Sequence, residues 1–384
     1  MVNSKRTALM VGASLLTAFA MAGPSSPWTV TAAGEESGER TVEDGGTGPY
    51  KAIMVGDSSL PTHTIFRPKD LSAFGGRVKL PILAWGNGGC ANSPAAHQNY
   101  LSEIASHGFL VVAIGPPPAP GAGRGGGGGG GGNTLLAAVD WAIAQNGDNA
   151  SAYKGKLDVS KIAVFGHSCG GLQALEVSGD RRVSTTLVVD SGILNAGAAP
   201  GGRGNPGGAP GAPGAAGAPG AAGAPGAAGA PGAAGAPGAA GAPGAPGAPG
   251  AAPAAAGPGA PGGPRAGGGA RGGGLPGMPP LTKEHLTKLH APVFYLLGGE
   301  KDIAYANGMD DFARIDKVPV FVANKDVGHG GTFSQPHGSD WAMASVAWLK
   351  WQLKGDADAG KLFTGTPPGL SMIAGWTVDK KNIR

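Results

Sequence analysis

Cysteine is scarce in this 384-residue sequence, which contains only Cys90 and Cys169. Two cysteines are too few to form a metal site by themselves, and no histidine-rich spacing typical of metal ligands accompanies them. We therefore expect no metal ion and no other cofactor. In an exported chain the two residues could form a disulfide, whereas the alternative is a pair of buried free thiols, and the sequence leaves both open.

A surplus of basic residues is also missing from the part of the chain that can fold. The formal charge of +4 arises from 29 Lys and Arg against 25 Asp and Glu. Six of the basic residues lie in the N-terminal leader or in glycine-rich stretches, namely Lys5, Arg6, Arg124, Arg203, Arg265 and Arg271. Without them, 23 basic residues face the 25 acidic ones, a formal charge of −2. Because no basic stripe is left, we expect no nucleic-acid partner.

Long apolar runs are absent except near the N-terminus. There, a basic pair precedes an apolar run over 8–22 that ends in Ala-Met-Ala. This order predicts a signal peptide over 1–22, cleaved after Ala22, and a secreted or periplasmic protein. A membrane anchor is the alternative, but the run is shorter than the ~20 apolar residues that a span needs. We expect no membrane span, and a flexible segment over 23–46.

Large apolar residues are missing from two further stretches. Between 196 and 274 the chain uses only Ala, Gly, Pro, Arg and Asn, and an unbroken glycine run over 125–132 ends a loop expected over 121–132. Neither stretch has enough apolar surface to offset the entropy of ordering a backbone, so 196–280 is predicted to be a disordered insertion. From 208 to 252, however, glycine recurs at every third position, as a collagen triple helix requires. We expect a monomer, and a trimer only if these repeats form a triple helix.

The remaining residues, 47–195 and 281–384, alternate short apolar runs with helical patterns. Strands are predicted over 50–55, 63–67, 80–85, 110–114, 162–165, 185–189, 293–297 and 318–322. Helices are predicted over 94–106, 134–145, 171–177, 308–315 and 339–353. Strands that alternate with helices imply a mostly parallel sheet with helices on both faces. The two pieces are therefore predicted to form one α/β domain, interrupted by the insertion.

The most informative motif is the sequence Gly166-His167-Ser168-Cys169-Gly170. It follows a predicted buried strand and leads into a predicted helix. This combination is typical of a nucleophile elbow, a sharp turn that presents a serine hydroxyl at the top of a sheet. Ser168 is therefore the candidate nucleophile.

A serine hydroxyl needs an imidazole to accept its proton and a carboxylate to orient that imidazole. In folds with this elbow the chain order is serine, acid, histidine, with acid and histidine in loops after later strands. Asp302 and His329 meet both conditions. Asp190, which ends an earlier strand, and Glu300 are alternative acids.

Among the other histidines, two lie near the motif and its partners. His337 shares a loop with His329 but resembles part of a turn before the last helix. His167 precedes the nucleophile and is expected to be a packing or pocket-wall residue. The remaining histidines are interpreted as structural.

A negatively charged oxygen that forms on the substrate needs backbone N–H donors. The residue after the nucleophile, Cys169, supplies one. The glycine-rich loop after the strand over 80–85 is expected to supply the other, and Asn87 is the candidate donor. This loop lacks the Gly-Lys-Ser/Thr ending of a nucleotide-binding loop, which argues against phosphate binding. A disulfide between Cys90 and Cys169 would lie beside both donors.

These motifs resemble the α/β-hydrolase fold, and within it the dienelactone-hydrolase-like group that includes polyester hydrolases, cutinase-like enzymes and bacterial lipases. The resemblance is carried by the elbow, by Trp85-Gly86-Asn87-Gly88-Gly89, and by the segments around Asp302 and His329. It implies hydrolysis of carboxylic esters, with a small-molecule or polymeric ester as substrate. His167 and Asn87 stand where polyester hydrolases carry Trp or His and an aromatic residue, so the resemblance does not specify a polyester.

Three other functions remain compatible with the sequence. A carbohydrate esterase, acting on acetyl or feruloyl groups, or a peptidase could use the same fold. The Gly-X-Y repeats could instead make this a collagen-like trimerising surface protein that carries a hydrolase domain. A catalytically dead binding module is disfavoured because all three catalytic positions are filled.

Overall fold

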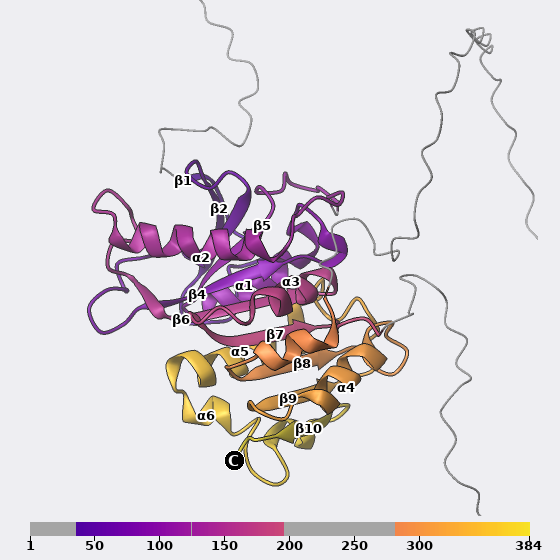
Figure 1. Cartoon of the computed structure of the whole chain (residues 1–384). Coiled ribbons are helices and arrows are strands. Elements are labelled where there is room, and N and C mark those ends of the chain that lie inside the picture. Colours follow the sequence, from indigo (N-terminus) through magenta and orange to yellow (C-terminus); the bar gives the residue numbers. More distant parts are fainter. Residues whose placement is uncertain (1–35, 124, 196–280) are drawn as a thin grey trace, which may run out of the picture. The chain divides into compact units, whose positions relative to one another are not determined.

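A computed structural model describes residues 36–123, 125–195 and 281–384 (Figure 1). The predicted signal peptide over 1–22 lies outside the described residues, and so does the insertion over 196–280 with its collagen-like repeats. Within the described ranges, none of the helices combines the length and the apolar character that crossing a membrane requires.

The described residues build one ten-stranded mixed sheet, in the order β1-β2-β3-β5-β4-β6-β7-β8-β9-β10. The strands are β1 (Glu36–Arg40), β2 (Ala52–Asp57), β3 (His63–Pro68), β4 (Leu80–Gly86), β5 (Leu110–Ile114), β6 (Leu157–His167), β7 (Val183–Val189), β8 (Val293–Leu297), β9 (Val320–Asn324) and β10 (Thr377–Lys381). The six central strands from β5 to β9 run parallel. The prediction of a mostly parallel sheet is therefore confirmed.

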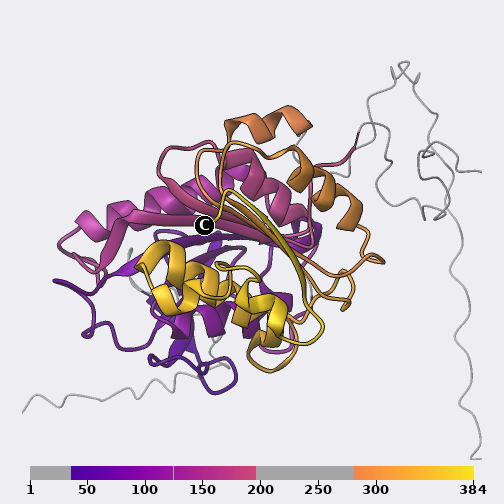
Figure 2. The ribbon, with the colours of Figure 1, turned by 90° about the horizontal axis from the view of Figure 1, so that it is seen from below.

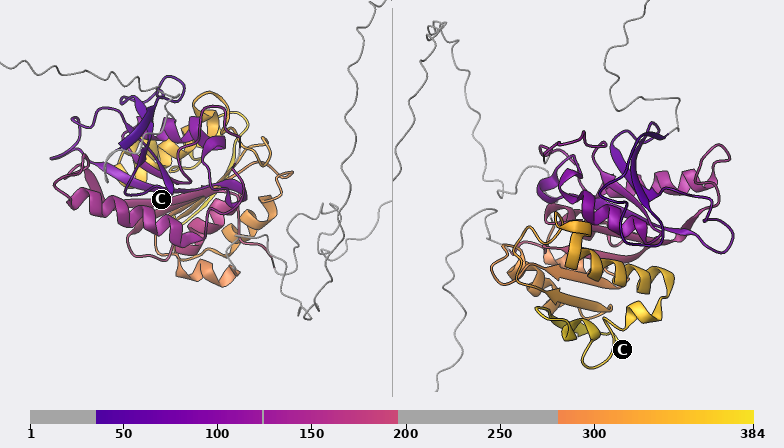
Figure 3. Two further views of the ribbon diagram at one scale, coloured as in Figure 1. Left: turned by 90° about the horizontal axis from the view of Figure 1, so that it is seen from above. Right: turned by 180° about the vertical axis from the view of Figure 1, so that it is seen from behind.

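Helices cover both faces of the sheet. They are α1 (Gln98–Ser106), α2 (Gly132–Gly147), α3 (Cys169–Val177), α4 (Tyr305–Arg314), α5 (Ser339–Lys354) and the short α6 (Ala357–Gly360). Side chains of α1 and α5 pack on one face, and those of α2, α3 and α4 on the other. Figure 2 shows the strands between the two sets, and the rear view of Figure 3 has α5 in front of the sheet.

Strand β4 shows why the central runs are apolar throughout. Its side chains alternate between the faces, with Leu83 and Trp85 in the core under α1 and α5, and Ile82 and Ala84 under α2. Since helices cover both faces, both sets of side chains are buried. The alternation of polar and apolar residues that marks a half-buried strand is therefore absent from β4.

Both edges of the sheet carry antiparallel strands that the apolar pattern did not predict. β1, whose residues fall within the segment 23–46 expected to be flexible, pairs with β2. β10 pairs with β9 and has no buried residue. An edge strand that buries little apolar surface leaves no run of hydrophobic residues, which is the signal on which strand prediction depends.

Candidate active site

Ser168 lies in the sharp turn between β6 and α3. Its backbone has a φ of +53°, a left-handed value that costs a non-glycine residue about 1–3 kcal/mol. Two hydrogen bonds hold this conformation. The Ser168 N–H donates to the Val189 carbonyl at 2.9 Å, and the Ser191 hydroxyl donates to the Ser168 carbonyl at 2.6 Å. The elbow is thus held by the neighbouring strand β7 and by the loop that follows it.

The glycine at position 170 of the elbow permits a close approach of two backbone segments. A Cβ atom at Gly170 would overlap the carbonyl oxygen of Gly86, at the end of β4. Only a residue without a side chain lets the first turn of α3 lie against β4. This contact brings the loop after β4 beside Ser168.

Three side chains predicted from the sequence meet at this edge of the sheet. Nε2 of His329 lies 3.0 Å from Oγ of Ser168, and Nδ1 of His329 lies 2.6 Å from Oδ1 of Asp302. Asp302 follows β8 and His329 follows β9, so the carboxyl ends of adjacent parallel strands bring them together. An ionised carboxylate only accepts hydrogen bonds, so Nδ1 carries the proton and Nε2 can accept one from the serine.

The Asp302 carboxylate is buried and well supplied with hydrogen-bond donors. Burial disfavours its charged form, but hydrogen bonds from His329 and from the N–H groups of Ala304 and Gly298 outweigh burial and lower its pKa. The Ala304 N–H donates at 2.9 Å and the Gly298 N–H at 3.3 Å. Asp302 is therefore ionised at neutral pH, the state needed to orient an imidazole.

The two alternative acids have other surroundings. Glu300 is exposed. Asp190 is fully buried behind Asp302 and accepts a hydrogen bond from Nε1 of Trp341 at 3.2 Å. Among the acidic side chains of the described ranges, Asp302 is the one hydrogen-bonded to His329.

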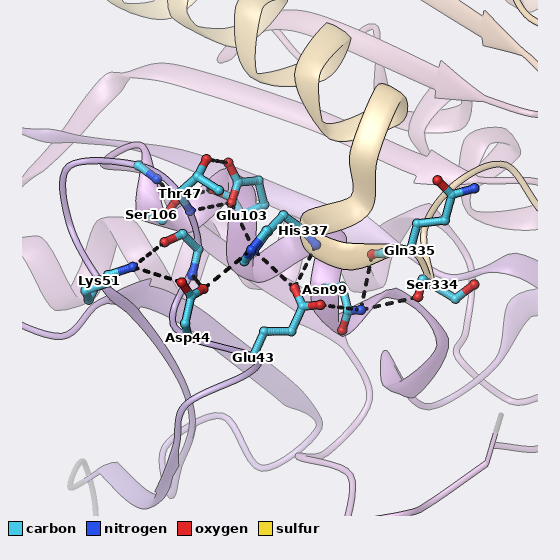
Figure 4. A network of polar contacts seen from close by, with 12 residues as sticks. Glu43, Asp44, Thr47, Lys51, Asn99, Glu103, Ser106, Ser334, Gln335 and His337 are labelled. Atoms are coloured by element: carbon cyan, nitrogen blue, oxygen red, sulfur yellow. Dashed lines mark hydrogen bonds and ion pairs between the residues drawn. The ribbon is translucent and has the colours of Figure 1, made fainter.

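His337, the other histidine of the loop that carries His329, belongs to a separate polar network (Figure 4). Its backbone N–H donates to Oε2 of Glu43 at 2.8 Å. Its ring nitrogens lie 3.2 Å from Glu43 and 3.6 Å from Asp44. Asn99 also donates to Glu43, at 3.1 Å. His337 therefore links the segment before β2 to the loop after β9.

His167 supports the main chain of His329. Its Nε2 lies 2.8 Å from the His329 carbonyl oxygen, so this nitrogen donates, and its Nδ1 lies 3.2 Å from Nε2 of His97. Both rings line the cavity at Ser168, where a pocket-wall role was predicted for His167 alone. His97 was interpreted as structural because nothing local marks it; the contact spans 70 residues of sequence.

A cavity of about 310 Å³ opens beside Ser168. Its lining consists of small residues and histidines: Gly88, Gly89, Ala91, Ser93, Ala96, His97, Gly125, His167, Ser168 and His329. Neither a large aliphatic nor an aromatic hydrocarbon side chain is among these lining residues. The space next to the nucleophile thus suits a small group better than a long apolar chain.

The structure gives Asn87 a buried structural position. Its Oδ1 accepts from Nε1 of Trp85 at 2.8 Å, and its Nδ2 donates to the carbonyls of Ala91 and Ile114 at 3.0 and 2.7 Å. Its neighbours Gly88 and Gly89 border the cavity. The sequence indicated this loop because its glycines permit a close approach of the backbone, and it named Asn87 as the donor without naming Gly88 or Gly89.

Cys90 and Cys169 form a disulfide, with a Cα–Cα distance of 5.2 Å. The bond joins the loop after β4 to the first residue of α3 and closes a separation of 79 residues. The loop that borders the cavity is thus covalently tied to the residue that follows Ser168.

In the ranges that the structure describes, no group of three or more His, Cys, Asp or Glu residues is arranged to hold a metal ion.

Comparison with known proteins finds distant relatives among the cutinases. No protein-family model matches the chain. Cutinase est2 of Thermobifida alba is 30% identical over 141 residues, which is 35% of this chain and 42% of that protein. Cutinase cut1 of Thermobifida fusca is 28% identical over 173 residues, 44% of this chain and 49% of that protein. The chain thus spans less than half the length of these relatives. The matches support a distant cutinase-like, α/β-hydrolase relationship and suggest an ester hydrolase.

Proposed function

We propose that this protein is a secreted serine hydrolase that cleaves carboxylic esters through an acyl-enzyme on Ser168. The observation that carries the proposal is the continuous path from Asp302 through His329 to Ser168, with contacts of 2.6 and 3.0 Å. The partial cutinase matches point to the same reaction class. Export rests on the leader over 1–22 alone.

The reaction follows from the positions of the protons. Nε2 of His329 accepts the Ser168 proton as Oγ bonds to the ester carbonyl carbon. It then gives this proton to the departing alcohol as the ester C–O bond breaks. A water molecule next gives its proton to Nε2 while its oxygen attacks the acyl-enzyme. The bond to Oγ breaks, the proton returns to Ser168, and a carboxylic acid leaves. Asp302 stabilises the protonated imidazole in both halves.

The oxyanion that forms in each half is stabilised by backbone donors. The Cys169 N–H is one, and it also begins α3, where the helix dipole favours negative charge. The second comes from the Asn87–Gly89 backbone. Asn87 is the donor expected from sequence, and the Gly88 and Gly89 amides are additional candidates because these residues border the cavity.

The lining of the cavity favours a short acyl group. Glycine, alanine, serine and histidine side chains offer little apolar surface to a fatty-acyl chain, so longer chains would gain little by binding. An acetyl ester of a carbohydrate is a second candidate, since Ser93 and His97 supply polar groups to the same cavity.

Labelling and turnover test this function directly. We expect the wild type to react with a fluorophosphonate probe and to hydrolyse p-nitrophenyl acetate faster than the palmitate ester. Ser168→Ala removes the attacking oxygen, so labelling should vanish and turnover should fall by several orders of magnitude. Acetylated xylan and a solid polyester, tested in parallel, separate the carbohydrate and polymer alternatives. A folded wild type that never labels would contradict the proposal.

A further inference from the structure

Asp190 is a buried carboxyl group that the proposed mechanism leaves without a role. It follows β7 directly, while Asp302 follows the adjacent parallel strand β8. Its side chain is fully buried, and its backbone has a φ of +44°. A hydrogen bond of 2.7 Å from its N–H to the Leu296 carbonyl holds it there. Strained, buried polar residues are concentrated at functional sites, so its surroundings are informative.

The two oxygens of Asp190 have different partners. Oδ2 accepts from Nε1 of Trp341 at 3.2 Å and lies 3.9 Å from Nε2 of His167. Oδ1 has no N–H or O–H donor with good geometry in the described residues, although it is buried. Both aspartates nevertheless lie against Gly298: Oδ1 of Asp190 is 3.1 Å from the position that a Cβ atom would take there, and Oδ2 of Asp302 accepts from the Gly298 N–H at 3.3 Å. Two carboxylate oxygens can form a hydrogen bond only if one of them carries a proton.

The surroundings decide which of the two holds the proton. Burial, and then the negative charge of Asp302, raise the pKa of Asp190 well above its usual range and outweigh the lowering by the N–H groups of Trp341 and Gly298. Asp302 has the opposite tendency, because several donors point at it. The other titratable groups near Asp190 are His167 on β6 and Tyr100 on α1, and burial raises the pKa of Tyr100 as well. The neutral member of the pair is therefore Asp190.

We propose that Asp190 is a positioning residue: its neutral carboxyl donates a hydrogen bond from Oδ1 to the Asp302 carboxylate and so holds Asp302 in line with Nδ1 of His329. Trp341 fixes the rotation of the Asp190 side chain through Oδ2, which leaves Oδ1 as the oxygen that is free to donate. The bond also spreads part of the negative charge of Asp302 away from the imidazole. This role rests on the proposed function, since it acts through the acid of the catalytic path.

An isosteric variant and a truncating one separate this role from a purely structural one. Asp190→Asn keeps the shape, and its amide can donate to Asp302 while its carbonyl accepts from Trp341. Its kcat should stay within about threefold of wild type. Asp190→Ala removes the donor, so kcat on p-nitrophenyl acetate should fall by about tenfold to a hundredfold at similar KM, the usual range for a hydrogen bond to a charged group.

The pH profile supplies a readout that simple loss of packing would not move. Without its donor, Asp302 stabilises the protonated imidazole more strongly, so a higher pH is needed to free Nε2. The acid limb of kcat/KM should therefore move to higher pH in Asp190→Ala and stay in place in Asp190→Asn. Glu300→Gln, at an exposed carboxylate nearby, is the matched control and should change neither.

Infrared spectroscopy tests the proton without relying on activity. A neutral carboxylic acid has a C=O stretch that a carboxylate lacks. The measurement is made at pH 8, where Asp311, whose pKa burial raises to about 6, is ionised. The band should then be present in the wild type and missing in Asp190→Asn. Absence of the band in the wild type would overturn the inference, even for an active enzyme or when Asp190→Ala does not fold. Equal losses in Asp190→Asn and Asp190→Ala would also overturn it. An inactive, unlabelled wild type would instead contradict the proposed function.

Discussion

Ser168 is held from two sides, and the two sides use different forces. On the acid side, the loops after β7, β8 and β9 contribute charged and polar side chains: Asp190 is buried, Asp302 is hydrogen-bonded to His329, and His329 is hydrogen-bonded to Ser168. On the oxyanion side, the loop after β4 contributes backbone and is held by backbone and by the disulfide of Cys90.

The glycine run over 125–132 is hydrogen-bonded to the segment after β4 on the oxyanion side. The Cys90 carbonyl accepts hydrogen bonds from the N–H groups of Gly128 and Gly129 at 3.1 and 2.9 Å. The Asn92 N–H donates to the Gly126 carbonyl at 3.0 Å. A run that buries no core of its own thus pairs with the loop that borders the cavity.

This contrast shows how each side should fail. The acid side depends on which atoms carry protons, so it responds to pH and to substitutions that change a donor into an acceptor. The oxyanion side has no titratable side chain in its contacts with the glycine run. It should respond to reduction of the disulfide and to added bulk.

The largest effect is expected from Asp302→Asn on the acid side. The amide would donate to Nδ1 of His329, which forces the proton onto Nε2 and stops it from accepting the serine proton. Turnover should fall by about 10³ to 10⁴-fold, measured as kcat on p-nitrophenyl acetate. Glu300→Gln, which leaves the path untouched, serves as the control. A mild loss here, with a severe one in Asp190→Asn, would move the acid to Asp190.

The second-largest effect is expected from reduction of the disulfide on the oxyanion side. Closing a loop of 79 residues should stabilise the fold by about 2 to 4 kcal/mol, so the unfolding temperature should drop on reduction. We also expect a moderate loss of kcat, because the loop after β4 is then tied to α3 only by packing. Mass spectrometry of the unreduced protein should show the mass lowered by two hydrogens. Two alkylatable thiols in the native protein would contradict the bond.

Added bulk in the glycine run gives a matched pair. A Cβ atom at Gly129 would lie 2.8 Å from the Ala91 carbonyl oxygen and 3.1 Å from that of Cys90, whereas at Gly126 it would meet open space. Gly129→Ala should displace the oxyanion loop and lower kcat by about tenfold, in line with a partly misplaced oxyanion donor. Gly126→Ala should be neutral. Equal behaviour of the two variants would show that the run does not position the loop.

The pH dependence of stability should differ between the sides. The lowered pKa of Asp302 means that its stabilising contribution is present above the ordinary aspartate pKa of about 3.9 and is lost as pH falls through its folded value. The difference in unfolding free energy between wild type and Asp302→Asn should therefore shrink on acidification. The difference between wild type and Gly129→Ala should stay constant. Urea unfolding at several pH values measures both.

The smallest effect is expected from replacing residues 196–274 with a short Gly-Ser linker. Both flanks of the insertion are attached to α4 by contacts that do not involve the insertion. Asp311 accepts from the Ile193 N–H at 2.8 Å and from Lys283 at 2.7 Å. The replaced stretch lacks any large apolar residue that could cover the cavity. Short-ester turnover should stay within about threefold and the unfolding temperature should hardly change. A large loss of turnover would show that the insertion also helps to hold the active site.

Local patterns were enough to predict most of the central sheet and the residues that meet at its edge. The elbow around Ser168 and the loop positions of Asp302 and His329 are readable because strand, turn and helix signals each span only a few residues. The edge strands β1 and β10 were missed because they carry no apolar run. His97 was missed because its role arises from a neighbour distant in the sequence.

By itself, the sequence determined the order of the central elements, the serine in its turn and the carboxyl groups available at the strand ends. The tertiary structure decided which carboxyl group contacts His329, which one is left neutral behind it, and what the glycine run contacts. The physical reason is that burial, hydrogen bonding and pKa depend on atoms that only folding brings together. Asp190 and Asp302 are both aspartates after buried strands, and only their neighbours distinguish them.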